Sequence, residues 1–281
     1  MSRTTIRGDG SFHGTGGTRL RYRSWEVPEP QAAIVLVHGF GDHSGRYDAV
    51  GEFFAGLDIS TLAFDLRGHG RSEGRRGYVP RFDTFLEELD GFSSEVRRRV
   101  SPSVPLFLLG HSMGGLIALR YLETREHPFR GAVIVSPWLD TAMPVPRWKL
   151  LLAPVLDRVL PILPVPAGIR AEDLSHDPEV VRAYDNDPLV HGIMTPRLFR
   201  EATAAAQLAE RESTRLNVPL LFLLAGDDRI VDTDRSLRLA RGLEGDVVIH
   251  TFDGRYHELL FEPDRDDILG ALRHWVMERV G

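Results

Sequence analysis

A serine between glycines, at the junction of two patterned segments, constrains this chain more than any other feature. The apolar run 104–109 is followed by Gly110-His111-Ser112-Met113-Gly114, and residues 115–122 then show the pattern of a helix. A serine in a sharp strand-to-helix turn exposes its hydroxyl, and only small neighbours let the strand and the helix pass so closely. A serine that opens a helix is more often a simple cap, but the flanking glycines favour a nucleophile. The pattern therefore predicts a parallel sheet that carries Ser112 as a reactive serine.

The composition is that of an ordinary globular protein. The chain has 281 residues, of which 42% are apolar, and a net charge of −6. This length suffices for one large α/β domain with an insertion. The mildly acidic balance gives no reason to expect nucleic acid as a partner. The chain has no cysteine, which excludes disulfides, thiolate metal sites and a cysteine nucleophile.

Neither a targeting segment nor a membrane-spanning segment is expected from the sequence. Residues 1–7 lack the apolar core of a signal peptide, and no stretch approaches the length of a spanning helix. We therefore expect a cytoplasmic protein.

Short apolar runs alternate with longer helical patterns over much of the chain. This alternation predicts βαβ units and a mostly parallel sheet flanked by helices. A turn at 14–17 separates two early strands. The second of these strands and the six that follow are expected at 19–27, 32–38, 59–65, 106–109, 132–136, 219–225 and 247–252, which gives a sheet of eight strands. Apolar residues at three- and four-residue steps predict amphipathic helices at 82–100 and 268–276.

The alternation fails between about Pro137 and Thr214. This region holds many of the prolines and has no convincing strand. We interpret residues 137–214 as a helical cap inserted into the sheet. The expected core is then made of two parts, residues 1–136 and residues 215–281.

A reactive serine needs a base, and the base needs a carboxylate to orient it. In this type of fold the serine, the acid and the histidine follow one another along the chain, each after a strand. His257 follows the last expected strand, and Asp227 and Asp228 follow the strand before it. Spacing favours Asp228 over Asp227 but leaves both open. Asp232 is expected only to cap the helix that begins near Thr233.

Attack on a carbonyl also needs hydrogen-bond donors for the oxyanion that develops. The backbone N–H after the nucleophile, that of Met113, is one candidate. The second donor is expected in the loop after an early strand, where the chain reads Val37-His38-Gly39-Phe40-Gly41. The backbone N–H of Phe40 is the candidate there.

Six segments of the chain carry recognisable motifs. They are 38–47 (HGFGDHSGRY), 65–74 (DLRGHGRSEG), 110–115 (GHSMGG), 185–189 (DNDPL), 228–232 (DRIVD) and Tyr256-His257. From about Trp25 to the C-terminus, the chain resembles the monoacylglycerol lipase and lysophospholipase branch of the α/β-hydrolases, which are related to serine aminopeptidases. The resemblance implies the α/β-hydrolase fold with a mobile helical lid. It places the catalytic acid on Asp228 and the second oxyanion donor on Phe40, where the family often has alanine, so the phenylalanine is expected to narrow the pocket.

Several residues within these motifs are expected to carry no chemistry. His43 and Arg46 are expected in a solvated loop, with contact to the polar end of a substrate as the alternative. Hydrogen bonds that hold loops and turns are expected from His38, Asp65, His69 and His111.

The segment 146–160 is unusually apolar for an insertion. Its apolar surface is expected to line an acyl tunnel or to touch a membrane or micelle, with a fully buried cap helix as the alternative. Pro154 is expected to kink the helix. One helical face holds Trp148, Leu151, Leu152, Val155 and Val159, and Leu150, Leu156 and Leu160 widen it.

The sequence therefore predicts a serine hydrolase that cleaves carboxylic esters of single-chain lipids, such as monoacylglycerols or lysophospholipids. Ser112, His257 and Asp228 form the expected triad, and no metal or organic cofactor is implied.

Three alternatives remain. A general carboxylesterase would use the same residues on other esters. A proline iminopeptidase-like aminopeptidase would need an acidic group in the cap for the substrate amine. A non-catalytic, ligand-binding relative would usually lack a member of the triad. The acidic candidates in the cap are Glu172, Asp173, Asp177 and Glu179.

Overall fold

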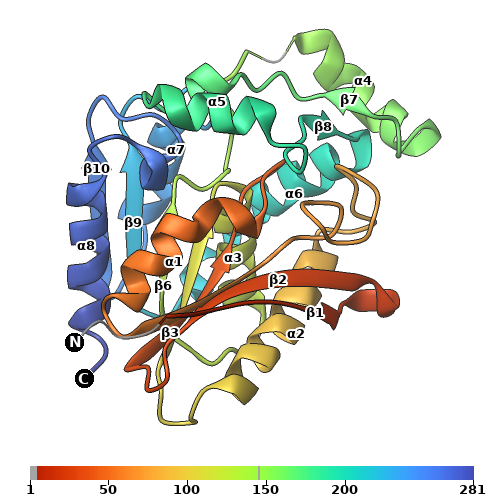
Figure 1. Cartoon of the computed structure of the whole chain (residues 1–281). Helices are drawn as coiled ribbons and strands as arrows, with labels where there is room; N and C mark the ends of the chain where they lie inside the picture. Colours follow the sequence, from red (N-terminus) through yellow and green to blue (C-terminus); the bar gives the residue numbers. More distant parts are fainter. Residues whose placement is uncertain (1–4, 145) are drawn as a thin grey trace.

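A twisted sheet of eight strands forms the centre of the molecule, with helices on both of its faces (Figure 1). The computed structural model describes residues 5–144 and 146–281; residues 1–4, part of the segment predicted to lack a signal peptide, lie outside it. The strand order is β1-β2-β4-β3-β5-β6-β9-β10. β1 and β2 run antiparallel to their neighbours and the other pairs are parallel. The strands are β1 (Ile6–His13), β2 (Arg19–Glu26), β3 (Ala32–Val37), β4 (Ile59–Phe64), β5 (Leu106–His111), β6 (Phe129–Val135), β9 (Leu220–Ala225) and β10 (Val247–Phe252).

The predicted sheet of eight strands is confirmed, and the expected segments agree with the observed strands within a few residues. The largest difference is at β6, which begins at Phe129 rather than at 132. Phe129 pairs with Leu106, and the register then shifts before Phe107 pairs with Gly131. Arg130, which is exposed, and Gly131 interrupt the apolar run, so the sequence pattern indicated a strand only from 132 onward.

β3 illustrates why the central strands read as unbroken apolar runs. All six of its residues are buried. Val35 packs in the hydrophobic cluster that contains α2 (Asp83–Arg99) and α3 (Met113–Thr124). Its neighbours Ile34 and Leu36 pack in the cluster that contains α1 (Asp48–Ala55) and α8 (Asp266–Met277). Because helices cover both faces of the sheet, successive side chains on opposite faces are equally apolar.

The amphipathic helices predicted at 82–100 and 268–276 are confirmed as α2 and α8. The helices of eight or more described residues are α1 (Asp48–Ala55), α2 (Asp83–Arg99), α3 (Met113–Thr124), α4 (Arg147–Val159), α5 (Pro178–Asn186), α6 (Pro196–Glu212), α7 (Thr233–Arg241) and α8 (Asp266–Met277). Asp232 accepts a hydrogen bond from the N–H of Arg235 at 2.9 Å, so its predicted role as the cap of α7 is confirmed.

Between β6 and β9 the chain leaves the sheet and forms α4, α5 and α6, which lie together at one end of the sheet (Figure 1). The prediction that this region has no strand is wrong in one detail. β7 (Val165–Pro166) and β8 (Ile193–Met194) form a short antiparallel pair. Two residues per strand are too few to show a period, so the sequence pattern could not reveal them.

α6 is the part of this insertion that packs most closely on the sheet's own helices. Leu198, Ala202 and Ala209 are buried, and they belong to the same hydrophobic cluster as α3. The small side chains let α6 lie along α3, which itself begins at the serine turn.

Candidate active site

Ser112 occupies the sharp turn between β5 and α3. Its backbone has φ 55° and ψ −119°, which a non-glycine residue rarely adopts. Its N–H donates to the carbonyl of Val135 at 2.9 Å, which anchors the turn to β6. A Cβ at Gly110 would lie 2.4 Å from the carbonyl oxygen of Gly114, and one at Gly114 would lie 2.1 Å from that of Val37. The flanking glycines are therefore required by the close approach of strand and helix.

His257 and Asp228 form a buried hydrogen-bonded pair. Nδ1 of His257 lies 2.7 Å from Oδ2 of Asp228, and the two side chains are 4% and 0% exposed. The other oxygen of Asp228 accepts hydrogen bonds from the N–H groups of Ile230 at 2.8 Å and Val231 at 2.9 Å. Both oxygens of the Asp228 carboxylate thus accept hydrogen bonds, which fixes the orientation of this carboxylate relative to the imidazole of His257.

The pair perturbs the ionisation of both partners. Burial alone would raise the pKa of Asp228, but His257 and the two backbone donors outweigh it and hold the pKa below its ordinary value. Burial likewise disfavours the charged imidazole, yet the Asp228 carboxylate outweighs it and raises the pKa of His257 above its ordinary value. A histidine held in this way is oriented by the carboxylate and made more basic.

His257 lies beside the residue that precedes Ser112. The rings of His111 and His257 are 5.0 Å apart between centroids, and Nε2 of His111 is 3.3 Å from the backbone carbonyl oxygen of His257. Asp227, the rival acid, is 57% exposed, and its nearest cation is Arg229 at 3.8 Å. The structure therefore joins Asp228, and not Asp227, to His257.

The loop after β3 lies directly against the serine. A Cβ at Gly39 would be 3.1 Å from the Cβ of Ser112. Phe40, the next residue, is 8% exposed and lines the same cavity as Ser112. Met113 is the first residue of α3, where backbone N–H groups have no partner within the helix. Both candidate oxyanion donors, Phe40 and Met113, thus belong to backbone segments at the serine.

A cavity of about 870 Å³ opens beside Ser112. Most of its wall comes from the chain between β6 and β9. Its polar lining includes Thr141, Thr195, Arg170, Asp173 and Arg229. Its apolar lining includes Phe40, Trp138, Met143, Leu156, Leu163, Val165, Ile169, Met194, Phe199, Ile230 and Val231.

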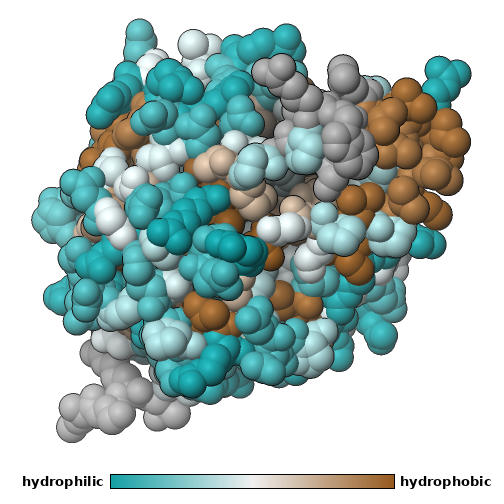
Figure 2. Space-filling view, turned by 90° about the horizontal axis from the view of Figure 1, so that it is seen from above, coloured by the Kyte–Doolittle hydropathy of each residue, from teal (hydrophilic) through white to brown (hydrophobic). Residues whose placement is uncertain are grey.

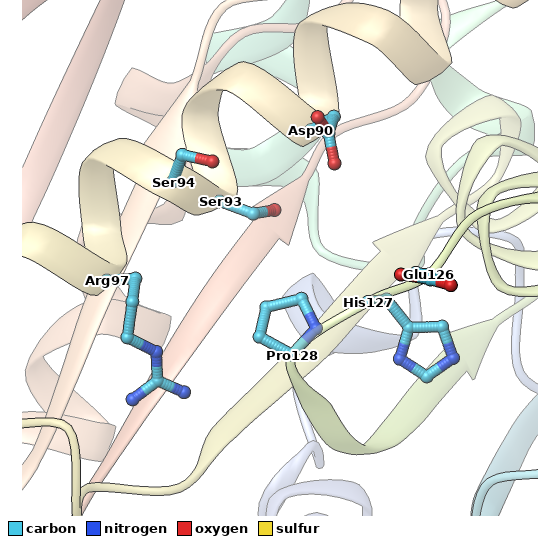
Figure 3. A pocket seen from close by; sticks show the side chains of 7 residues that line it. All are labelled: Asp90, Ser93, Ser94, Arg97, Glu126, His127 and Pro128. Atoms are coloured by element: carbon cyan, nitrogen blue, oxygen red, sulfur yellow. The ribbon is translucent and has the colours of Figure 1, made fainter.

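A second cavity of about 470 Å³ lies between α2 and the segment that leads into β6 (Figure 3). Ser93 and His127 stand on its walls, but the Ser93 hydroxyl donates to the carbonyl of Leu89 at 2.7 Å within α2. Asp90 accepts from the hydroxyl of Tyr121 at 2.8 Å. A hydroxyl and a carboxylate engaged in this way do not form a nucleophile and its base, so the cavity beside Ser112 is the candidate site.

The predicted hydrogen-bonding roles of three histidines and one aspartate in the motifs are confirmed. Asp65, for example, accepts from the N–H groups of Ser44 and Arg71, each at 2.8 Å. Nε2 of His38 accepts from the N–H of Leu66 at 3.0 Å. The other two contacts are His69 Nδ1 with the carbonyl of Arg67 at 3.0 Å, and His111 Nδ1 with the hydroxyl of Tyr47 at 3.2 Å.

The prediction that His43 and Arg46 lie in a solvated loop is wrong. Nε2 of His43 lies 2.9 Å from Oδ2 of Asp187. Arg46 is 9% exposed and donates to both oxygens of Glu258 at 2.6 Å. Both partners are more than 140 positions further along the chain, so local sequence could not indicate the pairing. Glu258 is a site residue that the sequence reasoning missed; its position directly after His257 was the available signal.

The carboxylates that an aminopeptidase could use for a substrate amine are already engaged. Asp173 lines the cavity, but it accepts two hydrogen bonds from Arg170, at 2.8 and 3.0 Å. These hydrogen bonds are the main cause that holds its pKa below the ordinary value. The other three are Glu172, paired with Arg170, Asp177, which caps α5, and Glu179, paired with Arg182.

α4 divides its apolar residues between the cavity and the surface. Leu156 lines the cavity, whereas Val155 and Val159 are 57% and 67% exposed. The alternative of a fully buried cap helix is therefore wrong for the described part. The side chains of Trp148, Leu150 and Leu151 lie outside the described residues. Figure 2 shows the resulting hydrophobic patch at the edge of the molecule where α4 lies; it continues through Leu152, Leu160, Ile162 and Leu163.

The described residues form neither a metal-binding cluster nor a membrane-spanning helix. Within residues 5–144 and 146–281, no group of three or more histidine and carboxylate side chains is arranged to hold a metal ion. None of the described helices has the length and apolar character needed to cross a membrane.

A mostly parallel eight-stranded sheet with a serine at the turn between β5 and α3 is the architecture of the α/β-hydrolases. Within that class, the family model described as serine aminopeptidase, S33, matches residues 28–264, and the chain belongs to this family. The predicted resemblance to the monoacylglycerol lipases is confirmed by the relatives that follow.

Two curated relatives and one solved structure are similar over nearly the whole chain. A monoacylglycerol lipase of Mycolicibacterium smegmatis is 31% identical over 280 residues, covering 99% of both chains. Phospholipase YtpA of Bacillus subtilis is 30% identical, covering 89% of this chain and 96% of the relative. The crystal structure of Paleococcus ferrophilus monoacylglycerol lipase is 32% identical with a TM-score of 0.82, covering 98% of this chain and 99% of that one.

Proposed function

We propose that this protein is a serine hydrolase that cleaves carboxylic esters of single-chain lipids, monoacylglycerols or lysophospholipids. The observation that carries this proposal is the strained Ser112, which lines an apolar cavity of about 870 Å³. An apolar cavity with few polar groups suits a long acyl chain whose ester carbonyl reaches the serine. The relatives support the same chemistry, since one is named a monoacylglycerol lipase and another a phospholipase.

In the proposed mechanism, Oγ of Ser112 attacks the ester carbonyl carbon and Nε2 of His257 takes the hydroxyl proton. Asp228 keeps the other ring nitrogen protonated and stabilises the imidazolium, in keeping with the 2.7 Å hydrogen bond between them. The N–H groups of Phe40 and Met113 stabilise the oxyanion.

Collapse of the tetrahedral intermediate breaks the ester bond. The alcohol leaves with the proton from His257, and the acyl group stays on Ser112 as an ester. Water then gives a proton to His257 and attacks the acyl-enzyme. The second collapse releases the fatty acid and returns the proton to Ser112.

We further propose that residues 137–214 act as a cap that covers the acyl chain. The apolar lining contributed by Leu156, Val165 and Phe199 supports this role. The exposed patch on α4 supports transient contact with a lipid surface, from which a single-chain lipid could enter. The enzyme would then work in the cytoplasm and bind membranes or micelles only peripherally.

An aminopeptidase is the less favoured reading. Such an enzyme needs an acidic group free to bind an amine, and the four carboxylates considered in the cap are each paired or engaged in capping. A non-catalytic relative is disfavoured as well, because serine, histidine and aspartate are all present.

A substrate panel tests the proposal. Monoacylglycerols, lysophosphatidylcholine, diacylglycerols and short p-nitrophenyl esters would be compared with an amino-acyl arylamide. We expect turnover of the single-chain lipid esters at the highest kcat/KM and none of the arylamide. Preference for short esters over lipids would favour a general carboxylesterase, and hydrolysis of the arylamide alone would refute the lipid-ester proposal.

A further inference from the structure

The segment 184–195, which comprises the last residues of α5 and the connection to α6, packs directly on the loop after β3. We call residues 38–46 the oxyanion loop. The N–H of His191 donates to the carbonyl of Gly41 at 3.0 Å. Gly41 has φ +74°, and a Cβ there would lie 2.3 Å from the carbonyl oxygen of His191. The ring of Phe40 meets that of His191 edge-on, with 5.7 Å between centroids. The two backbones are therefore in contact beside the candidate oxyanion donor.

His43 and Asp187 form the side-chain link between the same two segments. Nδ1 of His43 accepts from the N–H of Gly45 at 3.1 Å, so the ring proton of the neutral histidine is on Nε2. Nε2 then donates to Oδ2 of Asp187 at 2.9 Å. Oδ1 of Asp187 accepts from the N–H of Leu189 at 2.8 Å. Each polar atom of the pair has a defined partner, so the link has one geometry.

Arg46 completes the contact from the far end of the oxyanion loop. Its guanidinium lies 4.9 Å from the ring centroid of Tyr184, on α5, and donates to Asp42 at 3.2 Å. The same guanidinium pairs with Glu258 at 2.6 Å. The oxyanion loop is thus held between the 184–195 segment and the loop that carries His257.

The 184–195 segment is itself fixed to the sheet domain at a second point. The N–H of Thr195 donates to the carbonyl of Gly77 at 3.0 Å, and its hydroxyl donates to the same oxygen at 2.6 Å. Nε2 of His191 lies 3.1 Å from the carbonyl of Gly68. α4, by contrast, presents exposed apolar side chains such as Val159. The insertion therefore has a part anchored on the core and a part that is partly uncovered.

From these contacts we propose that Asp187 is a positioning residue for ester hydrolysis. Through its hydrogen bond to His43, it holds the oxyanion loop so that the N–H of Phe40 points at the developing oxyanion. The inference rests on the proposed function, because it assigns a role in that reaction. It predicts an effect on the transition state and not on the binding of the acyl chain, because neither His43 nor Asp187 lines the cavity beside Ser112.

Kinetics of Asp187→Ala test this role. The variant is expected to lower kcat for a p-nitrophenyl ester about 10- to 100-fold with KM changed by less than about twofold, because small displacements of a catalytic group have effects of this size. Asp185→Ala is the matched control: the residue has the same side chain, lies on the same segment and is exposed. It is expected to keep the wild-type kcat.

Two inhibitors separate positioning from a general loss of structure. A trifluoromethyl ketone forms a tetrahedral adduct whose oxygen needs the oxyanion donors, whereas a glycerol alkyl ether with the same chain has no carbonyl. In Asp187→Ala, the ketone should lose affinity by about the same factor as kcat, and the ether should bind as before. Equal weakening of both inhibitors, or a wild-type kcat, would overturn the proposal.

Variants of His43 keep the test decisive if Asp187→Ala fails to fold. His43→Gln retains an N–H donor that can reach Asp187, whereas His43→Asn retains only the acceptor for the N–H of Gly45. Glutamine should therefore preserve more activity than asparagine, and the reverse order would count against the link. If the wild-type protein shows no ester hydrolysis that is lost in Ser112→Ala, the proposed function itself is refuted. That result is obtained before any of the Asp187 or His43 variants is compared.

Discussion

Arg46 donates two hydrogen bonds of 2.6 Å to Glu258, the residue directly after His257. Both side chains are less than a tenth exposed, at 9% and 4%. The pair fastens the loop of the proposed base to the loop after β3. Loss of one partner of such a buried ion pair strongly destabilises the protein, because the remaining charge is buried and water cannot solvate it in place of the lost partner.

Removal of one charge should therefore destabilise the protein more than removal of both. Glu258→Leu is expected to lower the free energy of unfolding by about 3 kcal/mol, since it removes two hydrogen bonds and leaves the buried Arg46 paired only with Asp42, at 3.2 Å. The double variant Arg46→Met with Glu258→Leu should recover most of this loss. Urea unfolding of the two single variants and the double variant measures the difference. A double variant that is less stable than both single variants would contradict the expectation.

Ser112→Ala should abolish turnover without unfolding the protein. We expect kcat for a p-nitrophenyl acyl ester to fall roughly 10⁴-fold or more, because the proposed nucleophile is lost. Labelling by a fluorophosphonate should disappear in the same variant. An unchanged circular dichroism spectrum serves as the folding control, and undiminished turnover would refute the assignment.

Ser112→Gly should stabilise the protein while inactivating it. A non-glycine residue at φ 55° and ψ −119° is strained by about 1–3 kcal/mol, and glycine removes the strain. Chemical denaturation should show a higher midpoint for the glycine variant than for Ser112→Ala. Equal midpoints would mean that the turn is not strained.

The pH dependence of kcat/KM should report the ionisation of His257. The proposed base acts only when neutral, so activity should rise with pH. Because Asp228 raises the pKa of His257, the midpoint should lie above the ordinary histidine value of about 6.5. In Asp228→Asn the burial that lowers the pKa remains and the carboxylate is gone, so the midpoint should move to lower pH. In the same variant, the plateau of kcat/KM at high pH should fall by roughly 10⁴-fold, since His257 is no longer held in the correct tautomer. Initial rates between pH 5 and 9 on a pH-stable ester measure both effects, and an unmoved midpoint would contradict the pairing.

The apolar patch on α4 should matter only when the substrate is in a lipid surface. Val155→Ser with Val159→Ser removes two exposed apolar side chains. Each contributes about 1 kcal/mol to contact with a lipid surface, so activity on monoacylglycerol in vesicles should fall roughly 10- to 30-fold. Hydrolysis of a short soluble ester should not change. Ile6→Ser, which removes an exposed isoleucine from the edge strand β1, is the control. A matching loss on both kinds of substrate would argue against surface contact.

The sequence predicted those parts of the fold that depend on local pattern. β5, the serine turn and α3 follow from an apolar run, two glycines and a helical period, and the cap at Asp232 follows from its place before α7. The two glycines are informative because β5 and α3 pass so closely there: a Cβ at Gly110 would lie 2.4 Å from the carbonyl oxygen of Gly114.

The contacts that the sequence could not predict join distant positions. The partners of His43 and Arg46 are Asp187 and Glu258, and no period or spacing relates them. Spacing left Asp227 and Asp228 both open, since adjacent carboxylates differ only in the side of the chain on which they emerge. In the structure, Oδ2 of Asp228 lies 2.7 Å from Nδ1 of His257, whereas the side chain of Asp227 is 57% exposed.

The alanine-rich face of α6 limits how parts of this enzyme can be exchanged with those of a relative. Ala202, Ala205 and Ala209 are buried in the cluster that contains α3, so this helix completes the hydrophobic layer of the sheet. A chimera that replaces the whole insertion would remove α6 from this hydrophobic layer. The corresponding helix of the donor would then have to pack against α3 of the host. A graft meant to transfer chain-length selectivity should therefore stop before Pro196 and leave the alanine helix of the host in place.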